Sequence, residues 1–211
     1  MVQLLAVTDY IHSLAEAERV YDVTASFDAY RFFPEWTAQL DELTAPERER
    51  LDLIKQRYLY HRQHGHLLEN AVNFLVISPL LEMAGFYDPP FLLRSETSVR
   101  FEFEDETRKI YQGRIDALVV QEALWIVLVE SKRTSFNVTT ALPQALAYMA
   151  SGDVSSNGEQ PRFGLVSNGE RSIFIKLDKG EYAFSDDFSL NRRQNELWDV
   201  LQILNRLKRI S

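Results

Sequence analysis

Cysteine is absent from the 211-residue chain. Disulfide bridges and cysteine-ligated zinc or iron–sulfur sites are therefore excluded, and this composition is compatible with a reducing, cytoplasmic location. Apolar runs are short, and none approaches the roughly 18 residues that a membrane-spanning helix needs. The first 20 residues lack the basic region of a signal peptide and carry acids within an apolar pattern, which predicts an amphipathic helix. We therefore expect no association with a membrane.

Several sequence motifs of enzymes are also missing. The chain has no Gly-x-Ser-x-Gly and no His-Glu-x-x-His, so neither that type of serine hydrolase nor a zinc protease is indicated. It has no glycine-rich loop ending in Gly-Lys-Ser or Gly-Lys-Thr either. We therefore expect no ATP-driven motor and no ATP as a partner.

Positive charge is scarce, because 23 Lys and Arg residues face 31 Asp and Glu residues and give a formal net charge of −8. Most nucleic-acid-binding proteins carry a basic surface, so this balance weighs somewhat against such a partner. Net charge conceals distribution, however, and a metal site adds acids by design. The remaining composition, 45% hydrophobic and 26% charged, is typical of one globular domain, alone or with a small helical extension.

The first part of the chain predicts helices. In residues 44–65, Thr44 and Glu47 have the spacing of a capping box, which favours a helix start. The apolar residues of that helix keep helical spacing: Leu51, Ile54 and Tyr58. A second helix is expected over residues 66–84, with Pro79 kinking it or ending its first half.

Alternating and apolar runs after the helices predict strands. Three are expected in series, over residues 95–104, 108–120 and 124–132. The last two are separated by Gln121-Glu122-Ala123, which is short enough for a hairpin. A helix capped by Thr139 or Thr140 follows, and then two strands joined by a turn at Asn168-Gly169. An amphipathic helix capped by Ser189 ends the chain.

This order of elements predicts an α/β fold in which helices cover both faces of a mixed sheet. We assign residues 1–65 to a helical N-terminal extension and residues 66–211 to the α/β domain.

Two charged residues follow the most apolar run of the chain, LWIVLV at 124–129. Side chains two positions apart on a strand share a face, so Glu130 and Lys132 point the same way and Ser131 points the other way. The simplest interpretation is a salt bridge at a strand end.

Asp116 on the preceding strand joins these charges if the turn has the expected length. A three-residue turn pairs Val120 with Leu124 and Asp116 with Leu128, so Asp116 becomes a diagonal neighbour of Glu130, about 7–8 Å away. A two-residue turn would place the two carboxylates on opposite faces. The hypothesis therefore requires one particular register.

Two carboxylates and an ammonium group on one face cost stability unless they have a use. Hard oxygen ligands of this kind suit Mg²⁺ or Mn²⁺. A lysine beside such a site can orient the attacking water, help take its proton and stabilise developing negative charge. This set of residues is what metal-assisted phosphodiester hydrolysis needs.

Three further residues bear on this interpretation. Gln144 and Tyr148 are four positions apart on a predicted helix and share one of its faces. Alone they are an ordinary polar–aromatic pair, and Glu69, within the apolar helix HLLENAVNFLV, is alone a solvated position.

Taken together, these residues resemble a known family. The series GRID (113–116), ESK (130–132) and QALAY (144–148) is similar to the PD-(D/E)XK nuclease superfamily. The Gln-x-x-x-Tyr element makes it most similar to the N-terminal nuclease domain of type I restriction enzyme motor subunits, and RecB-like nucleases share much of the pattern. The resemblance covers roughly residues 66–178. It implies a restriction-endonuclease-like α/β/α sandwich.

The resemblance also implies a role for each residue. Asp116 and Glu130 would bind the metal, the Ser131 carbonyl would complete the site, and Lys132 would be the catalytic lysine. Glu69 matches the helix acid at the edge of many such sites.

Gln144 and Tyr148 would position the lysine and the DNA backbone near the scissile phosphate. Ile115 stands where the superfamily name has proline, as in many members.

The resemblance thus implies a Mg²⁺- or Mn²⁺-dependent DNA endonuclease without the motor. The alternative is a nuclease-derived domain that binds nucleic acid or a partner protein without cutting. The segments outside the resemblance are expected to make a homodimer or to cover the sheet.

A basic stretch, KQRYLYHRQHGH at 55–66, ends the first long helix. Three interpretations remain open for it. Its histidines, His61, His64 and His66, have a spacing that would let them bind a metal. The helix dipole favours cationic residues at this end, which is the structural interpretation. Phosphate contact is the third, because the stretch leads directly into the helix of Glu69.

Overall fold

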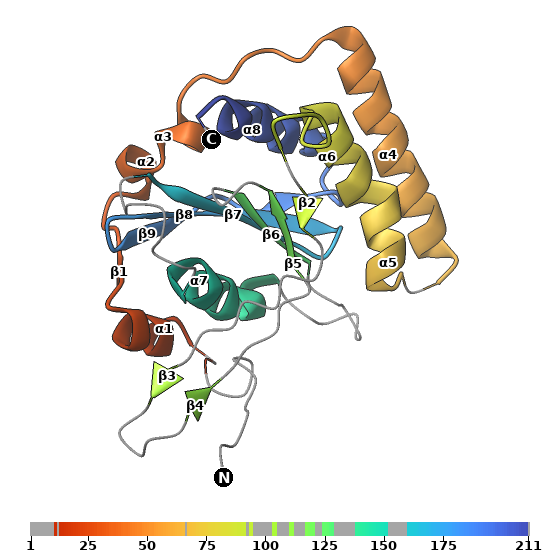
Figure 1. Ribbon diagram of the computed structural model, residues 1–211. Coiled ribbons are helices and arrows are strands. Elements are labelled where there is room, and N and C mark those ends of the chain that lie inside the picture. The colour runs from red at the N-terminus through yellow and green to blue at the C-terminus, as the bar shows by residue number, and fades with distance from the viewer. Residues whose placement is uncertain are drawn as a thin grey trace.

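The computed structural model shows a sheet between two layers of helices (Figure 1). It describes residues 11, 13–65, 67–91, 93–94, 103–104, 110–111, 117–120, 124–128, 138–151 and 160–210. The fold is mixed α/β, as the sequence predicts.

Eight of the described strands form one sheet in the order β1-β9-β8-β7-β6-β5-β2, with β10 paired to β8. Their bounds are β1 Thr24–Ala25, β2 Leu93–Arg94, β5 Ala117–Val120, β6 Leu124–Leu128, β7 Arg162–Ser167, β8 Arg171–Asp178, β9 Glu181–Phe184 and β10 Phe188–Ser189. The sheet is mixed, because β6 runs parallel to β7 and β1 parallel to β9, whereas the other pairs are antiparallel. Two short strands, β3 (Phe103–Glu104) and β4 (Ile110–Tyr111), pair separately.

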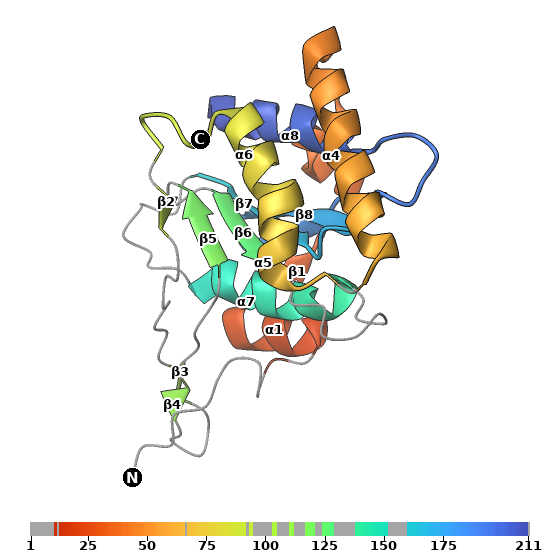
Figure 2. The same ribbon diagram turned by 90° about the vertical axis from the view of Figure 1, so that its right-hand side faces the viewer.

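Helices cover both faces of the sheet (Figures 1 and 2). One layer contains α1 (Leu14–Tyr21) and α7 (Leu142–Ser151), the latter preceded by a 3₁₀ turn at Val138–Ala141. The other layer contains α2 (Ala29–Phe32), α3 (Pro34–Thr37), α4 (Ala45–Gln63), α5 (Glu69–Val72), a π-helical turn (Asn73–Ile77), α6 (Ser78–Ala84) and α8 (Leu197–Ile210).

Each layer encloses its own hydrophobic core, because successive side chains of a strand point to opposite faces. On β8, Phe174 joins the core beneath α4, α6 and α8, whereas Ile173 and Ile175 join the core beneath α1 and α7. The first core is built on large side chains, and its Phe33 and Phe163 rings stack with centroids 6.0 Å apart. The sheet is therefore buried on both faces.

The capping box and the apolar stripe that predicted helix α4 are both present in the structure. The Thr44 side chain accepts from the backbone N–H of Glu47, and the Glu47 side chain accepts from the backbone N–H of Thr44, which completes the capping box. The predicted apolar stripe is buried: Leu51, Ile54 and Tyr58.

The second helix is interrupted, in line with the prediction for Pro79. Proline has no N–H to donate and its ring crowds the carbonyl four residues earlier, so the regular ladder fails in this region. The chain adopts a π-helical turn just before it, in which the N–H of Ser78 donates to the carbonyl of Asn73. The helix begins at Glu69 rather than at residue 66 and ends where Gly85 adopts a left-handed φ of 77°.

Of the strand predicted over residues 108–120, the described residues Ile110–Tyr111 pair with β3 and Ala117–Val120 belong to the main sheet, and the other positions lie outside the described residues. The predicted start of the last helix was wrong. Ser189 does not cap the last helix: it pairs with Arg171 in the ladder between β10 and β8. The helix begins at Leu197, whose N–H donates to Asn195 Oδ1 at 3.2 Å.

The strands β1, β2, β9 and β10 were not predicted, because three of them are only two residues long and β9 has only four residues. Strands this short are stabilised by their neighbours and carry little pattern of their own.

The described part of residues 1–65 contributes to both layers and to the sheet. Helix α1 packs against the core that contains α7, α4 packs against the core that contains α8, and β1 pairs with β9. The boundary at residue 65 stays a prediction. None of the helices described here is both long enough and apolar enough to span a membrane.

Candidate functional site

The hairpin between β5 and β6 has the register that the metal hypothesis requires. Val120 pairs with Leu124, and the ladder continues through Val119 with Trp125 to Ala117 with Val127. The predicted three-residue turn is therefore confirmed. Four of the predicted site residues lie outside the described residues: Asp116, Glu130, Ser131 and Lys132.

The described strand β6 ends level with its parallel neighbour. Leu128, its last residue, pairs with Ser167, the last residue of β7. We call this end of the two strands the carboxyl edge. Ser167 is buried, and its hydroxyl accepts from the N–H of Gly169 at 3.0 Å and hydrogen-bonds to the hydroxyl of Ser172 at 3.0 Å. These bonds hold the turn from β7 to β8 firmly at the carboxyl edge.

Helix α5 is seated on that turn. Gly169 has a φ of 81°, and a Cβ atom built there would lie 2.4 Å from Cγ1 of Val72. Only glycine allows this close approach with this backbone conformation. Glu69 begins the same short helix, so its backbone lies at the carboxyl edge. The position of its side chain is outside the described residues.

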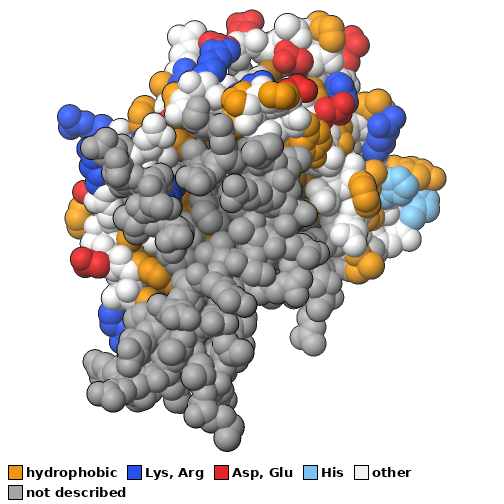
Figure 3. All heavy atoms as spheres, in the orientation of Figure 1, with side chains coloured by type: hydrophobic (Ala, Val, Ile, Leu, Met, Phe, Trp, Pro, Cys, Tyr) orange, Lys and Arg blue, Asp and Glu red, His pale blue; other side chains and the backbone are white. Residues whose placement is uncertain are grey.

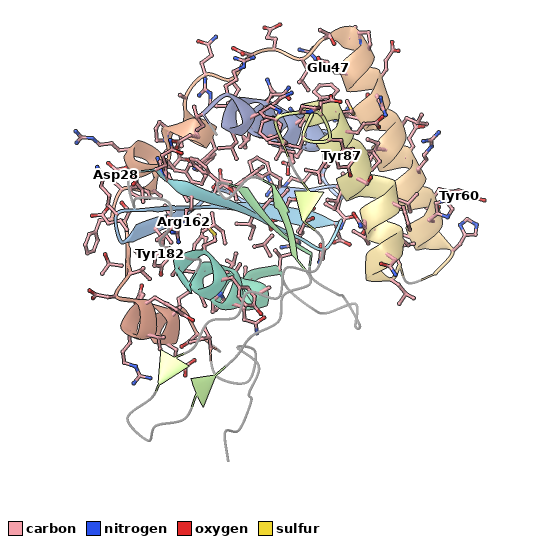
Figure 4. All side chains as sticks on the ribbon, viewed as in Figure 1. Asp28, Glu47, Tyr60, Tyr87, Arg162 and Tyr182 are labelled. Carbon is pink, nitrogen blue, oxygen red and sulfur yellow. The ribbon has the colours of Figure 1, made fainter. Side chains whose placement is uncertain are left out.

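Helix α7 starts at the same edge, on the other face of the sheet. It connects parallel strands, so it runs back from the end of β6 to the start of β7. Its last part lies over that start: Arg162 Nη1 donates to the carbonyl of Met149 at 2.6 Å (Arg162 is labelled in Figure 4). Gln144, near the first turn of α7, therefore lies toward the carboxyl edge and is half-buried.

Tyr148 lies one turn further along α7 and is buried, with 4% of its surface exposed. It belongs to the core shared with α1, against which Tyr21 packs. Burial raises the pKa of Tyr21 to about 12, and the neighbouring phenol of Tyr148 adds to the shift. No sequence signal predicts that α1 reaches Tyr148, because amphipathic spacing does not say which surface a helix covers.

The elements that carry the predicted residues thus converge on the carboxyl edge. Strand β6 leads to it, α7 starts there and α5 is seated there (Figure 1). Among the described residues, no three His, Cys, Asp or Glu side chains are grouped so that they could hold a metal ion. The set implied by the resemblance, two carboxylates and a backbone carbonyl, consists of hard oxygen donors and fits Mg²⁺ or Mn²⁺.

Two of the basic side chains in the second half of α4 contact other parts of the fold. Lys55 Nζ donates to the carbonyls of Arg192 and Gln194, at 2.6 and 3.1 Å. Arg62 pairs with Glu170 at 2.5 Å, in the turn at the carboxyl edge. These two cations therefore connect α4 to the loops around the sheet. His61 and His64 are exposed, and His66 lies outside the described residues.

Comparison of the chain with protein-family models, with curated proteins and with solved structures gives no match. Function is therefore inferred from the residues themselves and from where the fold places them.

Proposed function

We propose that this protein is a metal-dependent DNA endonuclease with a restriction-endonuclease-like α/β/α fold. The observation that carries the proposal is the register of β5 and β6, which pairs Val120 with Leu124. Asp116 directly precedes β5, and Glu130 and Lys132 follow β6 by two and four residues. This is the register in which the two carboxylates share a face and the lysine joins them.

The surrounding fold supports the proposal. Ligand sites of α/β proteins lie beyond the carboxyl ends of parallel strands, and β6 and β7 end together at the carboxyl edge. Gln144 and the backbone of Glu69 approach this edge from opposite faces of the sheet. The three residues that the resemblance adds to the Asp, Glu and Lys set, Glu69, Gln144 and Tyr148, thus lie on helices of both layers.

Each residue has a role in the proposed reaction. Asp116, Glu130 and the Ser131 carbonyl would hold Mg²⁺ or Mn²⁺, which supplies Lewis-acid stabilisation of the phosphate. Lys132 would orient the attacking water and stabilise the negative charge that develops as one phosphorus–oxygen ester bond breaks. Gln144 and Tyr148 would hold the lysine and the DNA backbone in place. One such site cuts one strand, so double-strand cleavage requires a dimer or two successive nicks.

The competing proposal is a domain of the same fold that binds nucleic acid or a partner protein without cutting. The net charge of −8 favours the form that binds a partner protein, because such an acidic chain repels the phosphate backbone outside any local basic surface.

Cleavage of supercoiled and linear DNA in Mg²⁺ or Mn²⁺ separates the two proposals. We expect nicked or linear products from the wild-type protein and none from Lys132→Ala. Lys179→Ala is the matched control, since Lys179 is exposed in the turn between β8 and β9. Loss of cutting only in Lys132→Ala supports the endonuclease. Absence of cutting by the wild type, with binding retained, supports the non-cutting domain.

A further inference from the structure

Five exposed residues form one stripe along the outer face of α4. Leu53, Arg57, Tyr60, His61 and His64 follow the spacing i, i+4, i+7, i+8, i+11, which places them on one side of a helix. The buried residues of α4 point to a different side, toward the core under α8. We call these five residues the outer stripe of α4.

The outer stripe holds an arginine and aromatic rings but no acid, in an acidic chain. Residues 53–68 contain neither Asp nor Glu, although the chain as a whole carries a net charge of −8. Arg62 pairs with Glu170 and Lys55 donates to backbone carbonyls, whereas Arg57 forms no ion pair with a described residue. This local charge is complementary to a polyanion.

Tyr60 is held in place although 60% of it is exposed. Its ring packs against His64 with centroids 4.5 Å apart and against His61 at 5.4 Å. His64 is fixed in turn, because its Nδ1 donates to the carbonyl of Tyr60 at 2.8 Å. Figure 4 shows Tyr60 pointing away from the body of the protein, and Figure 3 shows the histidines beside hydrophobic side chains at that margin. An exposed aromatic ring with a fixed orientation suits stacking against a base.

The outer stripe lies close to the carboxyl edge. Tyr58, between Arg57 and Tyr60, packs on the turn after β7: a Cβ atom at Gly169 would lie 3.3 Å from its ring. Arg62 pairs with Glu170 of the same turn. Helix α4 leads within a few residues into α5, where Glu69 begins the helix seated on that turn. A strand bound at the carboxyl edge has only a short path to the outer stripe.

We propose that the outer stripe of α4 binds a single strand of nucleic acid, with Tyr60 stacking on a base and Arg57 contacting a phosphate. This inference depends on the proposed function for its choice of ligand, and it adds the part of the surface that holds the strand beyond the cleavage site. A duplex offers no exposed base face to Tyr60, so single strands should bind more tightly than duplexes of the same length.

The test is a titration of a fluorescein-labelled single-stranded oligonucleotide with the full-length protein, followed by fluorescence anisotropy in EDTA so that no cutting occurs. We expect Tyr60→Ala to weaken binding about tenfold. Arg57→Ala should also weaken binding and reduce the dependence of log K on log salt by about 0.7. Phe27→Ala and Arg193→Ala are the matched controls, because both residues are exposed outside α4.

Equal binding by the wild type and both stripe variants would overturn the inference, as would absence of binding by the wild type. A homodimer that Tyr60→Ala converts to monomer, with unchanged DNA binding, would overturn it in favour of an interface between two copies. The endonuclease proposal and the outer-stripe proposal can be rejected independently of each other. Cutting without an effect of Tyr60→Ala rejects the stripe alone, and stripe-dependent binding without cutting rejects the endonuclease alone.

Discussion

Leu128 and Ser167, the last residues of β6 and β7, are partners in a parallel ladder. This pairing makes the two strands end at the same level, although 38 residues of sequence lie between Leu128 and Ser167, among them α7 and most of β7. The turn after Ser167 seats α5, and the chain after Leu128 leads into α7. The pairing thus brings three distant parts of the sequence to one edge.

Metal binding should stabilise the folded protein if Asp116 and Glu130 share a site. An ion at ten times its dissociation constant adds about 1.4 kcal/mol, which raises the Tm of a chain of this size by about 4 °C. We expect this rise with Mn²⁺ or Mg²⁺ in differential scanning fluorimetry, and its loss in Asp116→Asn and in Glu130→Gln. Asp88→Asn, at an exposed loop residue, should keep the rise. A rise that survives both site variants would place the ion elsewhere.

Gln144 and Tyr148 should affect the rate of cutting more than the binding of the metal. Their proposed role is positioning, and a misplaced reacting group costs about 10²-fold in rate. Tyr148→Phe keeps the buried ring but removes its hydroxyl, so cleavage should slow by more than any change in Tm accounts for. Gln144→Ala should slow cleavage similarly and retain the Tm rise with metal. Normal cleavage rates in both variants would remove these residues from the proposed site.

The Lys176–Glu35 ion pair should contribute strongly to stability. The two side chains are only 8% and 13% exposed, and their closest contact is 2.8 Å, from Nζ to Oε1. Removing one partner leaves a buried unpaired charge, so Glu35→Gln should lower the free energy of unfolding by about 3 kcal/mol. In urea unfolding, Glu35→Gln with Lys176→Met should lose less than the sum of the two single changes.

An exposed ion pair provides the control for this measurement. Arg209 and Asp41 contact each other at the surface, where each side chain is 67% exposed. Asp41→Asn should change the free energy of unfolding by only about 0.5 kcal/mol. An equally small effect of Glu35→Gln would show that the buried pair contributes nothing beyond a surface pair.

Asp199 should make the stability of the protein depend on pH. Burial raises the pKa of its carboxyl group, and the nearby Glu196 carboxylate adds to the shift. The folded state therefore holds the proton more tightly than the unfolded state. The resulting stability is present below the unfolded pKa and is lost as the pH rises through the folded pKa.

Asp199→Asn avoids this loss because asparagine stays neutral. The variant should therefore gain stability relative to the wild type between about pH 4 and about pH 7, as followed by urea unfolding at both values. A constant difference between the two proteins over this range would contradict the shift.

Local signals in the sequence predicted those features that a short segment decides by itself. The capping box of Thr44 and Glu47, the break near Pro79 and the turn at Asn168-Gly169 each depend on residues within a few positions. The register of β5 and β6 belongs to the same group, because the three-residue connection between them leaves little choice. The α/β class followed from the order of these elements.

The short strands and the true start of α8 could not be predicted in this way. Ser189 is a residue type that often caps helices, but here it pairs with Arg171 in the sheet. The side chain of Asn195 instead accepts a hydrogen bond from the N–H of Leu197, the first residue of the helix. Within residues 108–120, the described residues Ile110–Tyr111 and Ala117–Val120 pair with different strands, β3 and β6. Propensity is weak beside the pairing that tertiary neighbours impose.

Residue types and spacing identify the candidates for a metal site and predict that Glu130 and Lys132 share one face of a strand. Only the packed fold shows that α5, α7 and the end of β6 meet at the carboxyl edge, and that α1 covers Tyr148. The reason is physical: periodicity fixes which side of an element is apolar, whereas its partner is selected by packing among elements far apart in the chain.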